Sequence, residues 1–314
     1  MKMGLIKKPS ELSVKDTITA MIYGQPGIGK TTLACSAPAP VLFDFDGGVT
    51  RINGAHQCDT VQVQSWEEFQ QALQEVAEAG DTYKTVIIDT IGKLLTFMED
   101  YIKRTQPKMK QLDGSLSLKG YGVRKQMFVQ LLKDTATWRK NIIFVAHETE
   151  QKRGEEIIIR PEISGSAAND LVKELDLVGY MQAYGNNRTI TFDPTDRSYG
   201  KNTCNMGGVI NIPVVVDGEG KATGSNDFLC KVVESYKARQ AENVKTTAKY
   251  EALVSDIRAR VAEVETAEDA NNLLDWLKDC EHVYNSPALA WDLLKEKASN
   301  LDLKFNKTSK RYAV

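Results

Sequence analysis

The stretch of sequence that decides the fold is "YGQPGIGKTT", residues 23–32. It satisfies the pattern G-x-x-x-x-G-K-[ST] with Gly24, Gly29, Lys30 and Thr31. In this pattern the glycines allow backbone conformations that point successive N–H groups at phosphate oxygens. The apolar run "TITAMIY" (17–23) predicts a buried strand before the loop, and we expect a helix to begin near Thr31. This context favours a phosphate-binding loop over a tight turn that holds no ligand.

Two polar side chains of the loop have expected contacts with a nucleotide. The Lys30 ammonium is expected to reach the β- and γ-phosphates, and the Thr31 hydroxyl to be a ligand of Mg²⁺. The sequence therefore predicts that ATP binds together with Mg²⁺. The residues expected to contact the nucleotide are Gly24, Gln25, Pro26, Gly27, Ile28, Gly29, Lys30, Thr31 and Thr32.

A magnesium site of this kind also needs a carboxylate at the end of a buried strand. Asp89 ends the apolar run "KTVIID" (84–89) and is the candidate. We expect it to hold the ion through water, because Mg²⁺ gives up its water reluctantly. The alternative is that Asp89 only caps the helix that follows.

The base that activates the attacking water must lie elsewhere, because the residue after Asp89 is Thr90, which cannot serve as a base. The run "VLFDF" (41–45) predicts a second strand, which ends among Asp44, Asp46 and a glycine pair. We expect Asp46 to be the base, with Asp44 as the second candidate. The alternative is that both acids only shape the turn.

His147 ends another apolar run, "NIIFVAH" (141–147). A polar side chain at this strand end could sense the γ-phosphate or orient the water. The alternative is a strand-end histidine whose hydrogen bonds are satisfied locally. The predicted catalytic group is therefore Lys30, Asp46, Asp89 and His147.

Up to residue 150, apolar runs alternate with amphipathic segments, a pattern typical of βαβ units and a mainly parallel sheet. One helical segment, "SWEEFQQALQEVAEA" (65–79), has Ser65 and Glu68 at the spacing of a capping box. After residue 150 the strand-like pieces are short and separated by polar turns. They predict an antiparallel extension of the sheet and occupy residues 155–160, 175–184, 188–193 and 208–216.

From residue 228 onward the pattern is helical. Thr266 and Asp269 have capping spacing, and Ser286 is expected to cap a helix that begins at Pro287. The basic tail, residues 304–314, is expected to be disordered. We therefore predict an α/β core over residues 1–227 and a small helical region over residues 228–314.

These segments, in this order, resemble the ATPase core of RecA. "LFDFD" (42–46) is similar to the RecA segment that carries the catalytic carboxylate, which implies that role for Asp46, although Asp replaces Glu. "VIIDTI" (86–91) resembles the RecA Walker B strand, and His147 stands where RecA has a glutamine sensor.

The segment "MIYGQPGIGKTTLACSAPAPVLFDFDGG" (21–48) also resembles a family of phage-encoded ATP-binding proteins with a RecA core, some of which are single-strand annealing recombinases. The match extends over roughly residues 15–216. It implies a RecA-like P-loop NTPase fold, Mg²⁺-dependent ATP hydrolysis and action on single-stranded DNA in an infected bacterium. It also implies a homo-oligomer, with a single-strand-binding protein or another recombination or replication protein as a further partner.

A basic stretch lies where a DNA contact would be expected. Between residues 103 and 125 only Asp113 opposes seven cations, which are Lys103, Arg104, Lys108, Lys110, Lys119, Arg124 and Lys125. These cations could contact phosphates, and Tyr121 could stack on a base. The alternative is a solvated run of charge on a flexible loop.

Arg197 and Lys201 lie in "DPTDRSYGKNT" (193–203), a late loop. RecA-like subunits complete a neighbour's ATP site with basic residues from such a region, so the resemblance makes both residues candidates for a finger that acts in trans. The alternative is an ordinary basic turn.

Composition limits the other possibilities. The chain has 314 residues, a formal net charge of −2 and a pI near 6.0, which excludes a strongly basic coat for nucleic acid but allows a local basic patch. Five cysteines without a CxxC pair indicate reduced thiols, and the scattered histidines make a zinc site unexpected. No apolar run approaches the roughly 20 residues that span a bilayer. We expect a cytoplasmic protein with no membrane contact.

Two functions follow from these observations. The first is an oligomeric ATPase that binds single-stranded DNA for recombination, annealing or replication. The second is a nucleotide-dependent interaction switch without a DNA role, in which ATP orders the loops at 103–119 and 148–160 for a protein partner. A small-molecule kinase is weaker, because the sequence has no arginine-rich lid.

Overall fold

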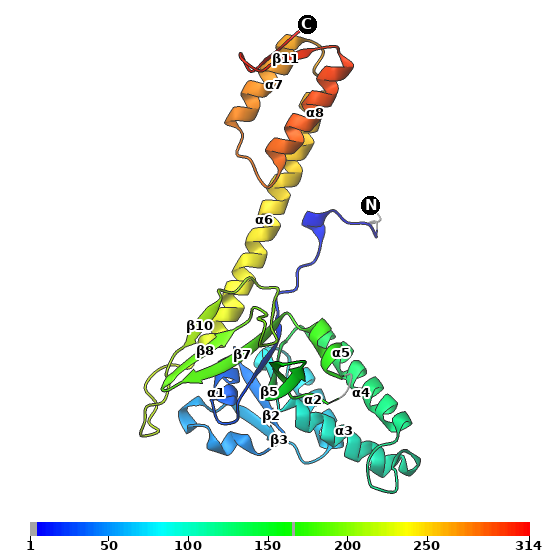
Figure 1. Cartoon of the computed structure of the whole chain (residues 1–314), viewed down its shortest axis with the longest axis vertical. Helices are drawn as coiled ribbons and strands as arrows, with labels where there is room; N and C mark the ends of the chain where they lie inside the picture. The colour runs from blue at the N-terminus through cyan, green and yellow to red at the C-terminus, as the bar shows by residue number, and fades with distance from the viewer. Residues whose placement is uncertain (1–4, 165–166) are drawn as a thin grey trace. The chain divides into compact units, whose positions relative to one another are not determined.

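The computed structural model describes residues 5–164 and 167–314 (Figure 1). By its contacts the chain divides into two compact units. The larger unit spans residues 15–237, and the smaller one contains residues 5–14 and 238–314. The composition of the sequence predicts a boundary at residue 228, whereas the contacts place the division inside a long helix, α6 (Phe228–Ala262).

A single large sheet organises the larger unit. Within the described residues it has ten strands, in the order β10-β8-β7-β1-β5-β4-β2-β3, with β6 paired to β5 and β9 paired to β7. The strands are β1 (Thr19–Gly24), β2 (Pro40–Asp44), β3 (Asp59–Gln62), β4 (Thr85–Asp89), β5 (Asn141–Arg153), β6 (Glu156–Pro161), β7 (Leu177–Tyr184), β8 (Asn187–Thr191), β9 (Lys201–Asn202) and β10 (Val209–Ile212).

The pairing of these strands confirms the predicted α/β class. All strands from β3 across to β7 are parallel to their neighbours along the main path. The strands β6, β8, β9 and β10 pair antiparallel and form the predicted extension. One detail differs, because β7 was expected in the antiparallel part and instead lies parallel to β1.

Helices cover both faces of the sheet. They are α1 (Lys30–Ala34), α2 (Trp66–Glu78), α3 (Ile91–Thr105), α4 (Leu118–Thr137) and α5 (Ala167–Glu174). Helices α2 to α5 pack on one face, and α1 with the first turns of α6 packs on the other. Because both faces are buried at the centre of the sheet, β1, β2 and β4 are largely apolar, whereas the edge strand β3 is more polar and more exposed. In β1, Met21 and Tyr23 enter the first core, and Ala20 and Ile22 enter the second.

Side-chain caps fix the starts of the helices, as the sequence indicates. Ser65 Oγ accepts a hydrogen bond from the Glu68 N–H at 3.1 Å, and Glu68 reaches back to the Gln64 N–H, which confirms the predicted capping position. Thr90 caps α3 in the same way, by accepting from the Lys93 N–H at 3.4 Å. The residue after Asp89 therefore has a structural role.

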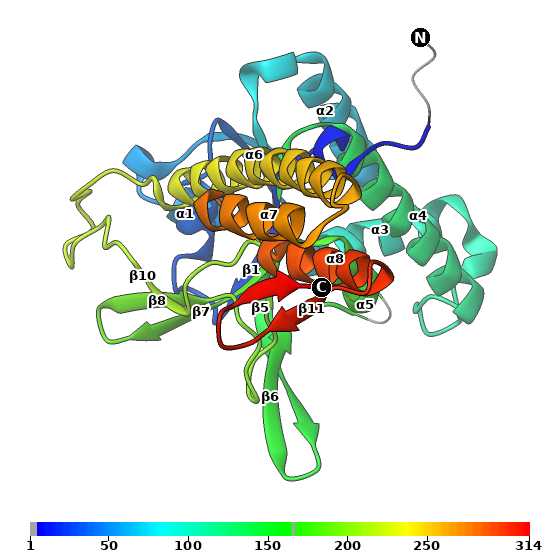
Figure 2. The same ribbon diagram turned by 90° about the horizontal axis from the view of Figure 1, so that it is seen from above.

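The segment 148–160, described as a loop in the switch hypothesis, is a hairpin, and the strand predicted at residues 155–160 is its second strand, β6. We expected β5 to end at His147, but it continues to Arg153 and pairs antiparallel with β6. Figure 2 shows this hairpin projecting beyond the rest of the sheet. The N–H of Glu162 donates to the carbonyl of His147 at 2.8 Å, so the base of the hairpin is joined to the predicted site.

The smaller unit is built from α6, α7 (Ala267–Asp279), α8 (Ser286–Asn300) and a hairpin of β11 (Lys304–Asn306) and β12 (Arg311–Ala313). The predicted capping box of Thr266 and Asp269 is confirmed. The cap of α8 is Asn285, one residue before the expected Ser286, whose hydroxyl instead accepts from the Val283 N–H.

The prediction of a disordered tail is wrong. Tyr312 is 5% exposed and lies against Phe305, with ring centroids 5.0 Å apart. Arg311 forms hydrogen bonds of 2.7 and 3.0 Å with the two carboxylate oxygens of Asp275. Two aromatic side chains and a paired arginine therefore hold a segment whose composition looks merely basic.

A search of the described helices finds none that is long and apolar enough to cross a membrane. None of the five cysteines, all of which the structure describes, forms a disulfide, and the Cys35 and Cys58 sulfurs lie 3.5 Å apart. Among the described residues there is no group of three or more potential metal-binding His, Cys, Asp and Glu side chains.

Candidate functional site

The carboxyl ends of the parallel strands bring the predicted catalytic residues to one edge of the sheet. Gly24, at the end of β1, pairs in register with His147 of β5. Asp44, at the end of β2, pairs in register with Asp89 of β4. Asp46 follows β2 by two residues. This edge is where open α/β sheets bind their ligands.

The loop from β1 to α1 adopts conformations that favour glycine. Gly27 and Gly29 have φ angles of +78° and +95°, in the left-handed region. At Gly24 a Cβ atom would lie 2.4 Å from the carbonyl oxygen of Met181, which is closer than side chains tolerate. The helix α1 begins directly afterwards, at Lys30, close to the predicted start.

The backbone of this loop fits an anionic ligand. Within the described part of the chain, the N–H groups of residues 27–31 have no hydrogen-bond partner. Backbone donors of folded proteins are normally paired. A row of unpaired donors at a glycine-rich turn is the arrangement that binds phosphate.

The Lys30 side chain is hydrogen-bonded to the backbone of the same loop. Its side chain is buried, and its Nζ donates to the carbonyl oxygens of Gly24 at 3.0 Å and Gln25 at 2.7 Å. Burial lowers the pKa of Lys30, and the charge of Asp89 opposes that effect. A phosphate would replace the two carbonyls with a partner of full opposite charge, which makes a stronger hydrogen bond.

Thr31 and Asp89 meet at the end of β4. Thr31 Oγ1 donates to Asp89 Oδ2 at 2.5 Å. Burial raises the pKa of Asp89 to about 6, although the Thr31 hydrogen bond acts in the opposite direction. A hydroxyl and a carboxylate in contact are oxygen ligands of the kind that Mg²⁺ prefers, so the residues fit this ion.

The two acids after β2 have different surroundings. Asp44 is buried, and its carboxylate accepts hydrogen bonds from the N–H groups of Gly48 and Val49, both at 3.0 Å. Asp46 is half-buried. The pKa values of Asp89 and His147 depend most on their own burial, and the negative charge of Asp46 raises both of them. Asp46 also accepts a hydrogen bond from the Gly48 N–H, at 3.1 Å, so both acids shape the turn. Asp44 is the more fully engaged of the two, and Asp46 stays the candidate base.

His147 faces the same group. Its Nδ1 lies 3.5 Å from Lys30 Nζ. Burial, and then the Lys30 ammonium, lower the pKa of His147 below its ordinary 6.5, which favours the neutral imidazole. A neutral imidazole can both donate and accept a hydrogen bond, as a sensor of a phosphate or of water must.

Sequence reasoning missed two residues that support the loop. Arg188 Nε donates to the carbonyl of Ile28 at 3.2 Å, and Asn226 Nδ2 donates to the carbonyl of Thr32 at 2.6 Å. These contacts join segments more than 150 residues apart, and no local pattern signals them. A cavity of about 510 Å³ lies here, lined by Ile28, Thr32 and residues 212–218 among others.

The basic stretch separates into engaged and free side chains. Arg124 is the clear correction, because it is buried, pairs with Glu99 and donates to Ser164 Oγ at 2.9 Å. This arginine holds α4 to its neighbours and is not available to DNA.

The other six cations of the stretch lie nearer the surface. Lys103, Arg104 and Lys125 pair with Asp100, Glu67 and Asp170. Lys108, Lys110 and Lys119 are exposed and form no ion pair in the described part of the chain. These three lysines lie in or next to the connection between α3 and α4 (Figure 1).

The two candidates for a trans-acting finger also differ. Lys201 Nζ donates to the carbonyls of Val172 at 2.9 Å and Lys173 at 3.1 Å, in the last turn of α5. It therefore stabilises the carboxyl end of a helix in its own subunit. Arg197 is exposed, so of the two it is the one free to reach another molecule.

Comparison with known proteins agrees with this site. No match was found among curated proteins. Among solved structures, the chain is similar to a KaiC-like protein from the hyperthermophilic archaeon Pyrococcus horikoshii, with 11% identity and a TM-score of 0.35, over 62% of this chain and 89% of that one. Residues 16–204, more than half of the chain, match the model of the AAA domain family. The fold, the loop at residues 24–31 and this match show that the chain carries a nucleotide-binding, P-loop ATPase-like domain and belongs to the AAA domain family.

Proposed function

We propose that the protein is a Mg²⁺-dependent ATPase with a RecA-like core that acts on single-stranded DNA, in the recombination, annealing or replication of a phage in its host's cytoplasm. The observation that carries the ATPase part is the convergence of Lys30, Thr31, Asp89 and Asp46 on one sheet edge. The unpaired N–H groups of residues 27–31 support it.

Each side chain has a defined part in hydrolysis. Lys30 moves from the carbonyls of Gly24 and Gln25 to the β- and γ-phosphates. Thr31 and Asp89 would hold Mg²⁺, which would neutralise charge on the phosphate oxygens. Asp46 accepts a proton from the attacking water, and His147 orients that water or senses the γ-phosphate. The cavity beside Ile28 and Thr32 receives the nucleoside.

Three exposed lysines support the DNA part of the proposal. Lys108, Lys110 and Lys119 carry charges that no acid in the described chain offsets. Lys103, Arg104 and Lys125 can join them, since surface ion pairs contribute only about 0–1 kcal/mol and are easily exchanged. Tyr121 is 41% exposed, with the Arg124 guanidinium 5.0 Å from its ring centroid, and would offer its ring for stacking on a base.

The protein would act as a homo-oligomer, with Arg197 as the candidate finger that reaches a neighbour's γ-phosphate. A single-strand-binding protein or another recombination or replication protein is a further expected partner. Both expectations follow from the RecA-like resemblance.

One observation favours the interaction switch as a second candidate. The hairpin of β5 and β6 begins at Glu148, directly after His147, whose carbonyl accepts from the Glu162 N–H, so a nucleotide that moves this histidine would also act on the hairpin. Leu112 and Leu118, beside the basic loop, are 110% and 90% exposed and could receive a protein partner.

The test is an ATPase assay with and without single-stranded DNA on three proteins: the wild type, Lys30→Ala, and a triple Ser variant of Lys108, Lys110 and Lys119. We expect Lys30→Ala to abolish hydrolysis. The triple variant should keep its basal rate but lose DNA stimulation, and its DNA affinity should depend less on salt, by about 2 in the log–log slope for three phosphate contacts. Hydrolysis that survives Lys30→Ala refutes the site, and an ATPase that ignores DNA in all three proteins favours the switch.

A further inference from the structure

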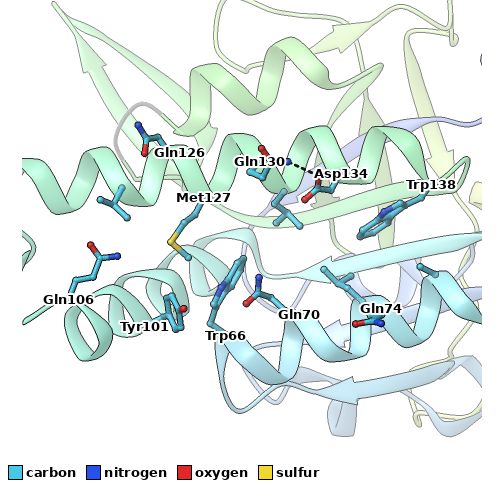
Figure 3. Close-up of a pocket in the computed structure, with 14 residues that line it drawn as sticks. Trp66, Gln70, Gln74, Tyr101, Gln106, Gln126, Met127, Gln130, Asp134 and Trp138 are labelled. Atoms are coloured by element: carbon cyan, nitrogen blue, oxygen red, sulfur yellow. Dashed lines mark hydrogen bonds between the residues drawn. The ribbon is translucent and has the colours of Figure 1, made fainter.

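Two features of the larger unit lie outside the residues assigned to the nucleotide. The first is a groove of about 720 Å³ between α2 and α4, lined by aromatic rings, aliphatic side chains and glutamine amides (Figure 3). Its lining has one carboxylate, Asp134, which already accepts a hydrogen bond from Gln130 Nε2 at 2.8 Å. The second is a pair of cysteines, Cys35 and Cys58, whose sulfurs lie 3.5 Å apart. The groove offers a surface, whereas the thiol pair can form a covalent bond.

Cys35 ends the helix that follows the phosphate-binding loop. It is the C-cap of α1, and its N–H donates to the carbonyl of Thr31 at 2.9 Å. One helical turn therefore separates it from the expected Mg²⁺ ligand. Its neighbours Ala34 and Ser36 are buried, and its own side chain is half-buried. Cys35 thus has a fixed place in the fold.

Cys58 directly precedes β3, the strand at the edge of the sheet. Its side chain is half-buried, and its neighbours Gln57 and Asp59 are exposed, so the pair is reached from solvent at Cys58. Gln57 Nε2 donates to the carbonyls of Val49 and Ile52, both at 3.0 Å, and these bonds hold the segment that leads to Cys58.

The distance between the two sulfurs suits a disulfide. Two sulfurs in contact at 3.5 Å must approach by about 1.5 Å to reach a bond length of about 2.05 Å. Rotation of the Cys58 side chain, between exposed neighbours, can supply this movement. The two residues are 23 positions apart. The bond would therefore close a loop that contains all of β2 together with Asp44 and Asp46.

The two thiols differ in acidity. The hydrogen bond that they share lowers the pKa of Cys58 and raises that of Cys35, and burial raises the pKa of Cys35 further. Burial also raises the pKa of Cys230 and of Cys280. The thiolate is the nucleophilic form of cysteine. Cys58 is therefore the expected nucleophile, and Cys35 is the thiol that reacts second.

We propose that Cys35 and Cys58 are a redox site that reacts with a small-molecule disulfide such as oxidised glutathione. The Cys58 thiolate attacks one sulfur of the oxidant, forms a mixed disulfide and releases one glutathione thiolate. Cys35 then loses its proton and attacks the Cys58 sulfur, which forms the protein disulfide and releases the second glutathione thiolate. Two protein thiols are oxidised, and one molecule of oxidised glutathione is reduced to two thiols.

The disulfide would hold α1 and the β2 segment in the arrangement that the reduced protein already has. Because the sulfurs already touch, the bond leaves the phosphate-binding loop in place, and it acts mainly by restricting the unfolded chain. The oxidised protein is therefore more stable and binds nucleotide as the reduced one does. Cytosolic disulfides are usually transient, so this bond forms under oxidising conditions and reverses afterwards. The inference requires neither ATP hydrolysis nor DNA.

The test treats the full-length protein with glutathione buffers of increasing oxidised fraction, followed by alkylation in denaturant and mass spectrometry. We expect Cys35 and Cys58 to be linked to each other while Cys204, Cys230 and Cys280 are still alkylated. The melting temperature of the larger unit should rise by about 5–10 °C, as expected for closing a loop of this length. Dithiothreitol should reverse the shift.

Two single variants separate the two thiols. Cys35→Ser should stop at a glutathione adduct on Cys58, and Cys58→Ser should form no protein disulfide. Neither should gain stability on oxidation. The matched control is Cys230→Ser with Cys280→Ser, which removes two other half-buried thiols and should respond like the wild type. Nucleotide binding is measured on both redox forms without hydrolysis, so failure here is distinct from failure of the ATPase proposal.

Three results would overturn the inference. The first is a wild type in which Cys35 and Cys58 stay reduced in the most oxidising buffer. The second is a wild type that stops at the Cys58 adduct, because Cys35 then fails to reach it. The third is a disulfide that forms but does not raise the melting temperature, or that weakens nucleotide binding. That result would mean that the bond distorts the fold around α1.

Discussion

The negative charge of Asp89 destabilises the folded protein as long as no cation is bound beside it. Its carboxylate is buried at the end of β4, and burial raises its pKa from 3.8 to about 6. The folded, metal-free protein therefore binds this proton more tightly than the unfolded chain does. Between pH 3.8 and about 6 the free energy of unfolding falls as pH rises, and above about pH 6 the full destabilisation remains.

The first prediction follows from the destabilising effect of the ionised Asp89 carboxylate. Asp89→Asn should raise the melting temperature of the metal-free protein at pH 7.5 and have a much smaller effect near pH 4, where the folded-state carboxyl is already protonated. It should also abolish Mg²⁺-dependent hydrolysis. Differential scanning calorimetry at both pH values, with an ATPase assay, checks this. A variant less stable than the wild type at pH 7.5 contradicts it.

Asp44 and Asp46 provide a matched pair at the same turn. We predict that Asp46→Asn lowers kcat by about 10²–10⁴, the usual contribution of a general base, with nucleotide affinity and stability unchanged. Asp44→Asn weakens the hydrogen bonds from the Gly48 and Val49 N–H groups, at a cost of about 2 kcal/mol in the free energy of unfolding.

Single-turnover hydrolysis and urea unfolding separate the two effects. If Asp44→Asn loses chemistry without losing stability, while Asp46→Asn remains active, Asp44 is the base instead.

At the scale of elements, α4 shows how a cation in a basic run becomes structural. Its start, Ser117, caps the helix through the Gly120 N–H, and Arg124 follows on the face that turns inward. There it meets Glu99 of α3 and the Ser164 carbonyl. Lys119, five residues earlier, is exposed to solvent. Spacing along the sequence does not distinguish them, because the neighbours of Arg124 come from two other segments.

We predict that Arg124→Ala costs about 3–5 kcal/mol in the free energy of unfolding, because it leaves Glu99 without its partner in a largely buried place. Lys119→Ala, on the same helix, should change stability by no more than about 0.5 kcal/mol. Urea unfolding measures both. The double variant Arg124→Met with Glu99→Leu should recover much of the loss, and an unrecovered double variant would show that shape rather than charge matters.

The whole molecule contains separate cores. Two cores lie on the two faces of the large sheet. A third core lies among α6, α7, α8 and the terminal hairpin. Tyr312 belongs to the last of these, and its hydroxyl is buried without a hydrogen-bond partner in the described structure. An unpaired buried hydroxyl is destabilising, while the ring that carries it is stabilising.

We therefore predict opposite effects of two substitutions at this position. Tyr312→Phe should keep or raise stability, by about 1 kcal/mol, since it removes the unpaired hydroxyl. Tyr312→Ala should lower the stability of the smaller unit by about 3–5 kcal/mol, and nucleotide binding should stay normal. Calorimetry should show one of two unfolding transitions shifted. A shift of both transitions together would mean that the units unfold as one.

The sequence by itself determined the nucleotide site and the class of fold. Gly24 to Thr31 is a local motif, and buried parallel strands are continuous apolar runs, so both are readable from residues close together in the chain. The sequence also predicted Asp89 at a strand end, where it pairs in register with Asp44. It predicted a strand end at His147 as well, but β5 continues to Arg153, and only its parallel pairing with β1 ends there.

Only the tertiary structure decided which of these side chains are free to act. It assigned Asp44 to the turn, buried Arg124 with Glu99, used Lys201 to cap α5, and ordered the tail through Phe305 and Tyr312. The physical reason is common to all four cases. The free energy of a polar or aromatic side chain depends on what surrounds it, and its neighbours here come from segments distant in the sequence.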